Sequence, residues 1–261
     1  MLRTTTVLLL ALSWSAPAVA RPIVDLTVID RTSGQQLPQA RHRGQRWIAG
    51  EPGHSYAVRL TNTSDERVLV VLSVDGVNAV TGEVADPSQA GYVLAPWQST
   101  EIAGWRKSYQ DVARFVFTAS ADSYAARTGR PENVGVIGIA VFQEARAHAQ
   151  LDAPSPPPHA AEAGAPARQA SESMQGSSMA DSSAQQIGTG HGAREWSPVA
   201  STSFVRATAT PFQVVALRYD DHASLVARGI LPPRLRHHEP QAFPTGFVAD
   251  PPKHRGWDPA R

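Results

Sequence analysis

The sequence predicts a mainly β protein: an antiparallel β-sandwich or jelly-roll-like head, a disordered linker, and a short C-terminal segment with a β-hairpin and a helix. Three observations favour this fold class. Apolar and polar residues alternate in several short runs, and Gly, Pro, Asn and Asp separate those runs. The chain also contains no cysteine, so burial of apolar side chains has to stabilise the fold without disulfides.

The first twenty residues have the pattern of a secretory signal peptide. Arg3 precedes an apolar run from Val7 to Leu12, and the small residues Ala18-Val19-Ala20 follow it. We expect cleavage after Ala20. The apolar run is shorter than the roughly 20 residues that a spanning helix needs, and no later run is long enough, so we expect no integral membrane segment after signal removal. The sequence therefore predicts a periplasmic or secreted protein.

Residues 21–144 are predicted to form the β-sandwich head. The run Arg67 to Val74 is almost continuously apolar, which is typical of a strand that packs on both faces. Other short runs complete a set of about eight expected strands, at 23–29, 56–60, 91–94, 100–105, 114–118 and 133–142. Short helical turns are expected around 109–113 and 122–128.

Residues 145–193 are predicted to be a disordered linker. They contain no aromatic residue and are rich in Ala, Ser, Gly, Gln and Pro, so they cannot bury enough surface to offset the entropy of ordering. We interpret Gly188 to Gly192 as a flexible hinge within this linker.

Residues 194–230 are predicted to contain a hairpin, from runs at 204–209 and 212–219, and a helix at 221–227. Asp220 or Asp221 would cap this helix, and Gly229 would end it. So short a segment makes a poor core by itself, and we expect it to dock on the head or on a partner. The proline-rich residues 231–261 are predicted to be a second disordered stretch.

The charge balance excludes one class of partner. The chain has 24 Lys and Arg against 23 Asp and Glu, and loss of Arg3 with the signal peptide makes the two numbers equal. This balance gives no electrostatic case for binding nucleic acid. The absence of cysteine excludes thiolate metal sites and cysteine nucleophiles. The chain also lacks the Gly-x-Ser-x-Gly, His-Glu-x-x-His and phosphate-loop motifs, and we predict no cofactor.

Aromatic and basic residues interleave in the second half of the head. Arg side chains suit carboxylate, phosphate or acidic glycan groups, and aromatic side chains beside them are typical of surfaces that bind sugars or peptides. The alternative is that the aromatic residues pack in the core and the arginines form a solvated rim. The candidate ligand-binding residues are Trp105, Arg106, Tyr109, Tyr124, Arg127 and Arg130.

Oxygen-bearing side chains near the middle of the head suggest a metal site. Asp75, Asn78 and Glu83 are candidate calcium ligands, because calcium prefers hard oxygen ligands on loops. The alternative is that they are turn residues, since their spacing is not that of an EF-hand. Histidines offer a second set, namely His191, His222, His237 and His238, but no pair has the spacing of a helical metal motif.

Five short motifs resemble an uncharacterised family of exported bacterial proteins with no known activity. They are Val74 to Asn78, Thr81 to Glu83, Gly91 to Leu94, Gly104 to Ser108 and Tyr124 to Gly129. The resemblance implies an exported bacterial protein, and it brings no catalytic or binding residues with it.

The leading hypothesis is an exported, non-enzymatic binding or interaction module of the bacterial envelope, with an envelope protein or glycan as its partner. One alternative is an envelope hydrolase that acts on carbohydrate or peptide. Another is a structural envelope component that assembles with itself through sheet edges. The sequence leaves the ligand and the oligomeric state open.

Overall fold

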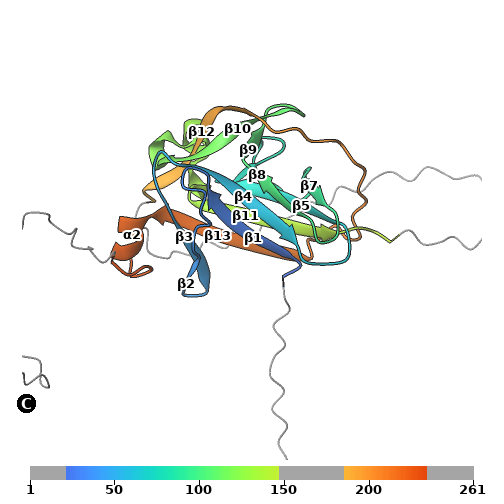
Figure 1. Cartoon of the computed structure of the whole chain (residues 1–261), viewed down its shortest axis with the longest axis horizontal. Coiled ribbons are helices and arrows are strands. Elements are labelled where there is room, and N and C mark those ends of the chain that lie inside the picture. Colours follow the sequence, from blue (N-terminus) through green and yellow to red (C-terminus); the bar gives the residue numbers. More distant parts are fainter. Residues whose placement is uncertain (1–21, 147–184, 234–261) are drawn as a thin grey trace, which may run out of the picture. The chain divides into compact units, whose positions relative to one another are not determined.

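A computed structural model describes residues 22–146 and 185–233. The described residues up to Leu231 belong to one compact unit, in which two sheets pack against each other as a sandwich, and this confirms the predicted fold class (Figure 1). The predicted signal peptide with Ala20, most of the predicted linker, and all but the first residues of the predicted tail lie outside the described residues. No helix in the described ranges is long and apolar enough to cross a membrane.

Sheet A is six-stranded, and each of its pairs is antiparallel. Its main path runs β1 (Val24–Asp30), β4 (Ser55–Asn62), β10 (Asp111–Ala119) and β12 (Ile187–Trp196). Two short strands extend it, because β8 (Ser99–Ile102) pairs with β4 and β9 (Gly104–Arg106) pairs with β10.

Sheet B is seven-stranded and mixed. Its main path runs β2 (Ala40–His42), β3 (Gln45–Gly50), β13 (Gln213–Asp221), β11 (Val136–Gln143), β5 (Val68–Val74) and β6 (Val77–Asn78), and β7 (Tyr92–Leu94) pairs with β5. The β13–β3 pair is parallel and the others are antiparallel. The short helices are α1 (Tyr124–Arg127) and α2 (His222–Ala227), with one-turn 3-10 helices at Ser120–Asp122 and Pro131–Asn133.

The core lies between the two sheets and is built from the inward-facing side chains of both. The Tyr56 ring stacks on Phe115 and Phe117, with ring centroids 5.3 and 4.2 Å apart. Strand β5 is buried on both faces, as its apolar run predicts. Val70 and its alternate neighbours pack between the sheets, whereas Leu69 packs with Phe142 on the outer face of sheet B.

The predicted hinge at Gly188 to Gly192 is wrong, because these residues lie within β12 and pair with β10. The predicted linker therefore extends too far towards the C-terminus. The glycines serve close packing. A Cβ at Gly188 would lie 2.6 Å from Cβ of Ser123, and a Cβ at Gly192 would lie 2.8 Å from Cγ2 of Val116. A glycine-rich segment is typical of a flexible linker, and the tertiary contacts that order this one cannot be predicted from composition.

The C-terminal segment differs from the predicted hairpin. Residues 204–209 form no strand; Arg206 makes only an isolated bridge with Glu144, and Phe204 packs on the outer face of sheet B. Strand β13 instead lies between β11 and β3, so it is an internal strand rather than an addition to an edge. Helix α2 begins after Asp221, whose side chain accepts a hydrogen bond from the Ser224 amide, as the capping pattern predicts.

One further predicted element is wrong, and one hairpin was not predicted. The helical turn expected at 109–113 is wrong, because Asp111–Ala113 pairs with β12 and its Val112 and Ala113 side chains are buried. The β2–β3 hairpin, by contrast, has no counterpart in the predicted strands. Its sequence carries several charged residues in place of the apolar alternation that predicts a strand.

Candidate functional site

The six predicted ligand-binding residues do not form one surface. Trp105 belongs to the core, since it is only 2% exposed and its ring meets Phe115 edge-on at a centroid distance of 4.8 Å. Its assignment to a ligand surface is therefore wrong. Strand β9 turns this side chain inward, and sequence alone does not show which face of so short a strand is buried.

Arg106 has a structural role. Its guanidinium donates hydrogen bonds to the Ser197 carbonyl and, at 3.0 Å, to the Ser197 hydroxyl, and this fastens the chain after β12 to β9. Tyr109 lies nearby, before β10, and is 68% exposed; Trp196, at the end of β12, is 65% exposed. Both aromatic side chains therefore reach solvent where the ends of β10 and β12 pair.

Tyr124, Arg127 and Arg130 come together around helix α1. The Tyr124 ring lies 5.6 Å from the His191 ring and 5.0 Å from the Trp105 ring, between their centroids. Arg130 places its guanidinium 5.7 Å from the Tyr124 centroid, while Arg127 is exposed in the last turn of the helix. We call Lys107, Tyr124, Arg127, His191 and Arg194 the His191 surface.

A β-bulge in β12 places His191 and Arg194 on the same face of the sheet. Ala113 pairs with Arg194 and Phe115 pairs with His191, so three steps along β12 oppose two steps along β10. Because Ala113 and Phe115 share one face of β10, His191 and Arg194 also project from one face of β12. Without the bulge, their odd spacing would place them on opposite faces of the sheet.

Close packing of α1 on β12 brings in the remaining residues. Ser123 caps α1 by accepting a hydrogen bond from the Ala126 amide at 3.2 Å. The absence of a side chain at Gly188 lets this cap lie directly against β12. Tyr124 and Arg127 are thereby held beside His191, although they lie more than sixty residues away in the sequence.

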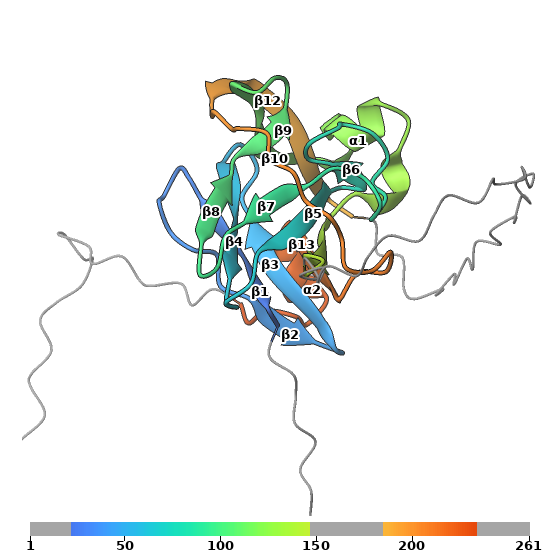
Figure 2. The ribbon, with the colours of Figure 1, turned by 90° about the vertical axis from the view of Figure 1, so that its right-hand side faces the viewer.

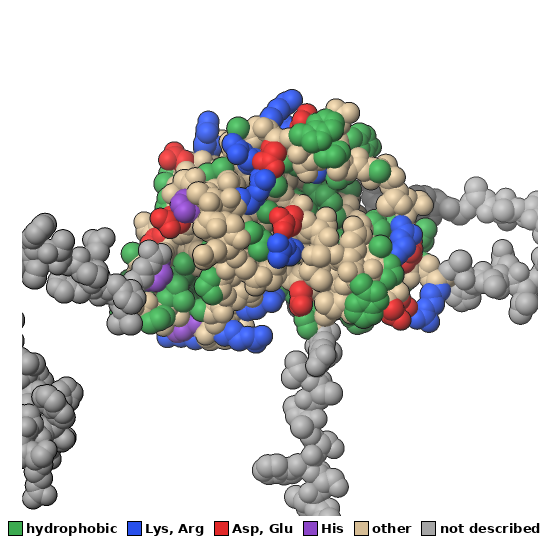
Figure 3. Space-filling model, viewed as in Figure 1, with side chains coloured by type: hydrophobic (Ala, Val, Ile, Leu, Met, Phe, Trp, Pro, Cys, Tyr) green, Lys and Arg blue, Asp and Glu red, His purple; other side chains and the backbone are tan. Residues whose placement is uncertain are grey.

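The electrostatic surroundings of His191 are cationic. Partial burial lowers the pKa of His191, and the charges of Lys107, Arg194 and Arg127 lower it further. These three cations come from three different segments. Figure 3 shows Lys and Arg side chains, with Asp and Glu side chains among them, beside hydrophobic ones at the end of the molecule formed by β9, β10 and β12. The surface is therefore suited to an anionic ligand.

The predicted calcium ligands are engaged within the fold. Asp75 is completely buried; its Oδ1 accepts from the Gly135 amide at 2.9 Å and the Tyr219 hydroxyl at 2.6 Å, and its Oδ2 accepts from the Thr189 amide at 2.7 Å. Asn78 accepts from the Val80 amide at 2.7 Å, and Glu83 is exposed.

These contacts favour the interpretation of Asp75 and Asn78 as turn residues, because their oxygens already accept hydrogen bonds from the protein. Within residues 22–146 and 185–233, no three His, Asp or Glu side chains are grouped so that they could hold a metal ion. Of the candidate histidines, His237 and His238 lie outside that part of the chain.

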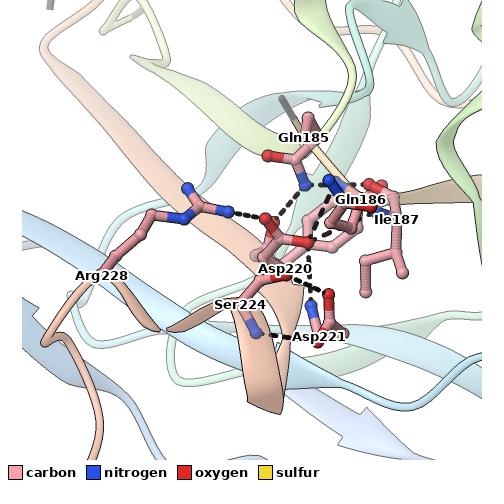
Figure 4. Close-up of polar contacts among 8 residues, drawn as sticks. Gln185, Gln186, Ile187, Asp220, Asp221, Ser224 and Arg228 are labelled. Carbon is pink, nitrogen blue, oxygen red and sulfur yellow. Dashed lines mark hydrogen bonds and ion pairs between the residues drawn. The ribbon is translucent and has the colours of Figure 1, made fainter. Parts of the chain in front are cut away.

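A second buried polar cluster joins the ends of three elements (Figure 4). Arg228, just after α2, pairs with the buried carboxylate of Asp220 at the end of β13. The other oxygen of Asp220 accepts from the Ile187 amide at the start of β12, at 3.3 Å. Gln185 donates to the Tyr219 carbonyl at 2.7 Å. Because Asp220 is fully buried, this cluster acts as a clamp for β12 and β13.

No known protein family, curated protein or solved structure matches this chain. Of the residues of the His191 surface, Tyr124 and Arg127 are predicted from the sequence as ligand-binding candidates, whereas His191 and Arg194 are not predicted to lie beside them. The only signal for them was the glycine pattern around His191, which in β12 marks close packing.

Proposed function

We propose that this chain is an exported, non-enzymatic binding module of the bacterial envelope, and that the His191 surface binds an acidic glycan. One observation carries the proposal: the charges of Lys107, Arg127 and Arg194 all act on His191, whose ring lies 5.6 Å from the ring of Tyr124 between centroids. The signal-peptide pattern in residues 1–20 supports export.

The chemistry of the surface fits a uronic acid unit. Arg guanidinium groups donate paired, charge-assisted hydrogen bonds to carboxylates, and Lys107 adds a compact positive charge. Tyr124 is half-buried beside His191, and the exposed side chains of Tyr109 and Trp196, towards the ends of β10 and β12, supply flat apolar faces that a sugar ring can contact. Aromatic and Arg side chains are enriched at binding surfaces for these reasons.

A binding role fits this surface better than glycoside hydrolysis does. Hydrolysis requires two carboxyl groups that face the sugar. Glu195 lies next to Arg194, but after the bulge it projects from the opposite face, where it pairs with Arg31 at 2.7 Å. The charged groups that shift the pKa of His191 are cations.

The proposal is tested by calorimetric titration of the mature protein with an oligosaccharide of uronic acids, and with the same oligosaccharide after reduction of its carboxylates to alcohols. We expect only the acidic form to bind. Arg127→Gln and Arg194→Gln should each weaken binding about tenfold or more, because a hydrogen bond to a charged group contributes roughly 1.5–3 kcal/mol. Arg59→Gln is the matched control, since Arg59 pairs with Glu101 elsewhere on sheet A.

Binding should also depend on pH. The pKa of His191 lies below its ordinary value in the free protein, and a bound carboxylate would raise it, so binding takes up a proton. Affinity should therefore increase as the pH falls from about 7 to about 5, where a uronate remains ionised. His191→Gln should remove this dependence on pH.

Equal binding of the reduced oligosaccharide, or unchanged affinity in both arginine variants, would exclude this surface as an acidic-glycan site.

A further inference from the structure

Strand β13 is an interior strand over only part of its length. It pairs with β11 from Gln213 to Arg218, but it pairs with β3 only from Arg218 to Asp221. The first residues of β3 belong to the β2–β3 hairpin, which projects away from the sheets in Figure 2. Within the described ranges, residues 213–217 of β13 therefore have a neighbouring strand on one side only.

The free side of β13 presents unpaired backbone. The Tyr219 amide donates to the Gly135 carbonyl of the strand alongside, at 3.0 Å, so the odd-numbered residues of β13 face β11. By the alternation of an antiparallel ladder, the amide and carbonyl groups of Val214 and Ala216 point the other way. A cleft lies there, between Gln45 and Arg46 of the hairpin and Val214, Ala216 and Arg218 of β13.

The open stretch of β13, residues 213–217, contains no proline and no charged residue. Val214 is 69% exposed and Phe212 is also exposed, so apolar side chains accompany the open backbone. Proteins usually cover such edges or interrupt them with Pro, bulges or inward-pointing charges, because an open edge is a template for another strand. The exposed edge next to a cleft is thus suited to an extended peptide.

The hairpin beside the cleft brings several positive charges together, and this arrangement lowers the stability of the fold. Arg41 lies directly opposite Arg46, and like charges in this arrangement are destabilising. Arg43 occupies the two-residue turn with a φ of 48°, a conformation that favours Asn or Gly. Among the described residues, no carboxylate forms an ion pair with Arg41, Arg43 or Arg46.

The charge is concentrated rather than neutralised. Burial and the nearby Arg41 lower the pKa of Arg46, and Asp25 opposes this shift. Arg218 adds a further cation at the closed end of the cleft, where its guanidinium lies 5.8 Å from the centre of the Trp47 ring. Figure 3 shows Lys, Arg and His side chains gathered over β2 and β3. No carboxylate of the described residues forms an ion pair with Arg46 or Arg218, and an acidic ligand would neutralise both charges.

We propose that the cleft between the β2–β3 hairpin and β13 binds an extended acidic segment of a partner protein. The segment adds as a strand to the free side of β13 and places its acidic side chains against Arg46 and Arg218, with Arg41 and Arg43 alongside. Backbone hydrogen bonds supply affinity, and the arginines select for acidic sequences. This inference does not depend on the glycan proposal, because it uses neither β12 nor α1.

The test uses the full mature chain and a fluorescent peptide of alternating Val and Glu, with anisotropy as the measure of binding. We expect this peptide to bind, and a peptide of alternating Val and Lys not to bind. Hydrogen exchange should show slower exchange of the Val214 and Ala216 amides when the acidic peptide is present. A peptide N-methylated at alternate residues on the side facing β13 should fail to bind, because it lacks the required donors.

Variants separate this cleft from the His191 surface. Arg46→Gln should weaken peptide binding roughly tenfold, as expected for loss of a charged contact at the centre of an interface; Arg127→Gln and Arg59→Gln should leave it unchanged.

Equal binding of polyglutamate or of the N-methylated peptide would show that the site attracts negative charge without strand addition, and would overturn the proposal. Absence of binding would also overturn the proposal. Binding only after removal of residues 234–261 would instead assign the cleft to this chain's own C-terminal segment.

Discussion

Asp75 has more hydrogen-bond partners in the core than its place in a tight turn requires. It has a φ of 53° between β5 and β6, and its carboxylate joins that turn to Thr189 in β12 and Tyr219 in β13. The network continues through the Thr189 hydroxyl to Tyr56, at 2.6 Å. Burial raises the pKa of Asp75 and raises the pKa values of Tyr56 and Tyr219 well above the usual value of a tyrosine.

This network predicts a large effect for a small substitution. Asp75→Asn should lower the free energy of unfolding by about 2 kcal/mol or more, because an amide group would oppose backbone donors and leave a buried N–H unpaired. Urea denaturation of the variant measures this effect. Asp65→Asn is the control, since Asp65 is exposed in a loop. Equal midpoints for the two variants would show that the network contributes little to stability.

At the residue scale, the sequence predicts which types of side chain a binding surface contains better than it predicts where each side chain lies in the fold. Tyr124, Arg127 and Arg130 were identified as candidates because they are close together in the chain, and the structure keeps them together. His191 and Arg194 could not be assigned to the same surface, because the bulge that orients them arises from pairing with β10. Trp105 was assigned to the wrong environment because burial depends on which face of β9 meets the other sheet.

At the scale of elements, a strand with a continuous apolar run can be predicted from the sequence. A strand that is ordered mainly by pairing and packing with neighbouring elements cannot. The continuous apolar run of β5 predicts burial on both faces, and both its inner and outer side chains are packed. Strand β12 is rich in glycine and outwardly resembles a linker. Its order comes from pairing with β10 and from packing against α1, and the glycines that permit this packing are equally typical of a linker.

The burial of β5 predicts the effect of a charge at its centre. Val70→Asp should destabilise the protein by roughly 4 kcal/mol or more, because it places an unpaired carboxylate between the two sheets. Val70 is completely buried there. Thermal unfolding monitored by circular dichroism measures the change. The exposed Val84 provides the control, and Val84→Asp should melt close to wild type. A melting temperature for Val70→Asp within a degree or two of wild type would mean that β5 is not central.

At the scale of the whole molecule, segments on both sides of residues 147–184 build one sandwich. Strand β12 joins sheet A and contributes His191, while β13 joins sheet B and forms one wall of the cleft. The Asp75 network and the Asp220 clamp link these late strands to the earlier part of the chain or to each other. Both proposed binding surfaces therefore depend on the position of the C-terminal strands.

The register of β13 against β11 tests this arrangement most directly, and the cysteine-free chain makes the test unambiguous. Gly138 and Ala216 lie directly opposite each other on the outer face of sheet B, and a Cβ at Gly138 would have no contact closer than 3.8 Å. A cross-strand pair of this kind has a Cα separation that a disulfide can bridge, at roughly 4.5–5.5 Å.

The measurement is the yield of intramolecular disulfide after mild oxidation of the double variant Gly138→Cys/Ala216→Cys, read by mass spectrometry of a proteolytic digest. We expect nearly complete cross-linking, with thermal stability at or above that of wild type. The variant Gly138→Cys/Val215→Cys, shifted by one residue so that its side chains point to opposite faces, should remain reduced. Failure of the first pair to cross-link, or equal cross-linking of both pairs, would contradict the placement of β13 in the sandwich.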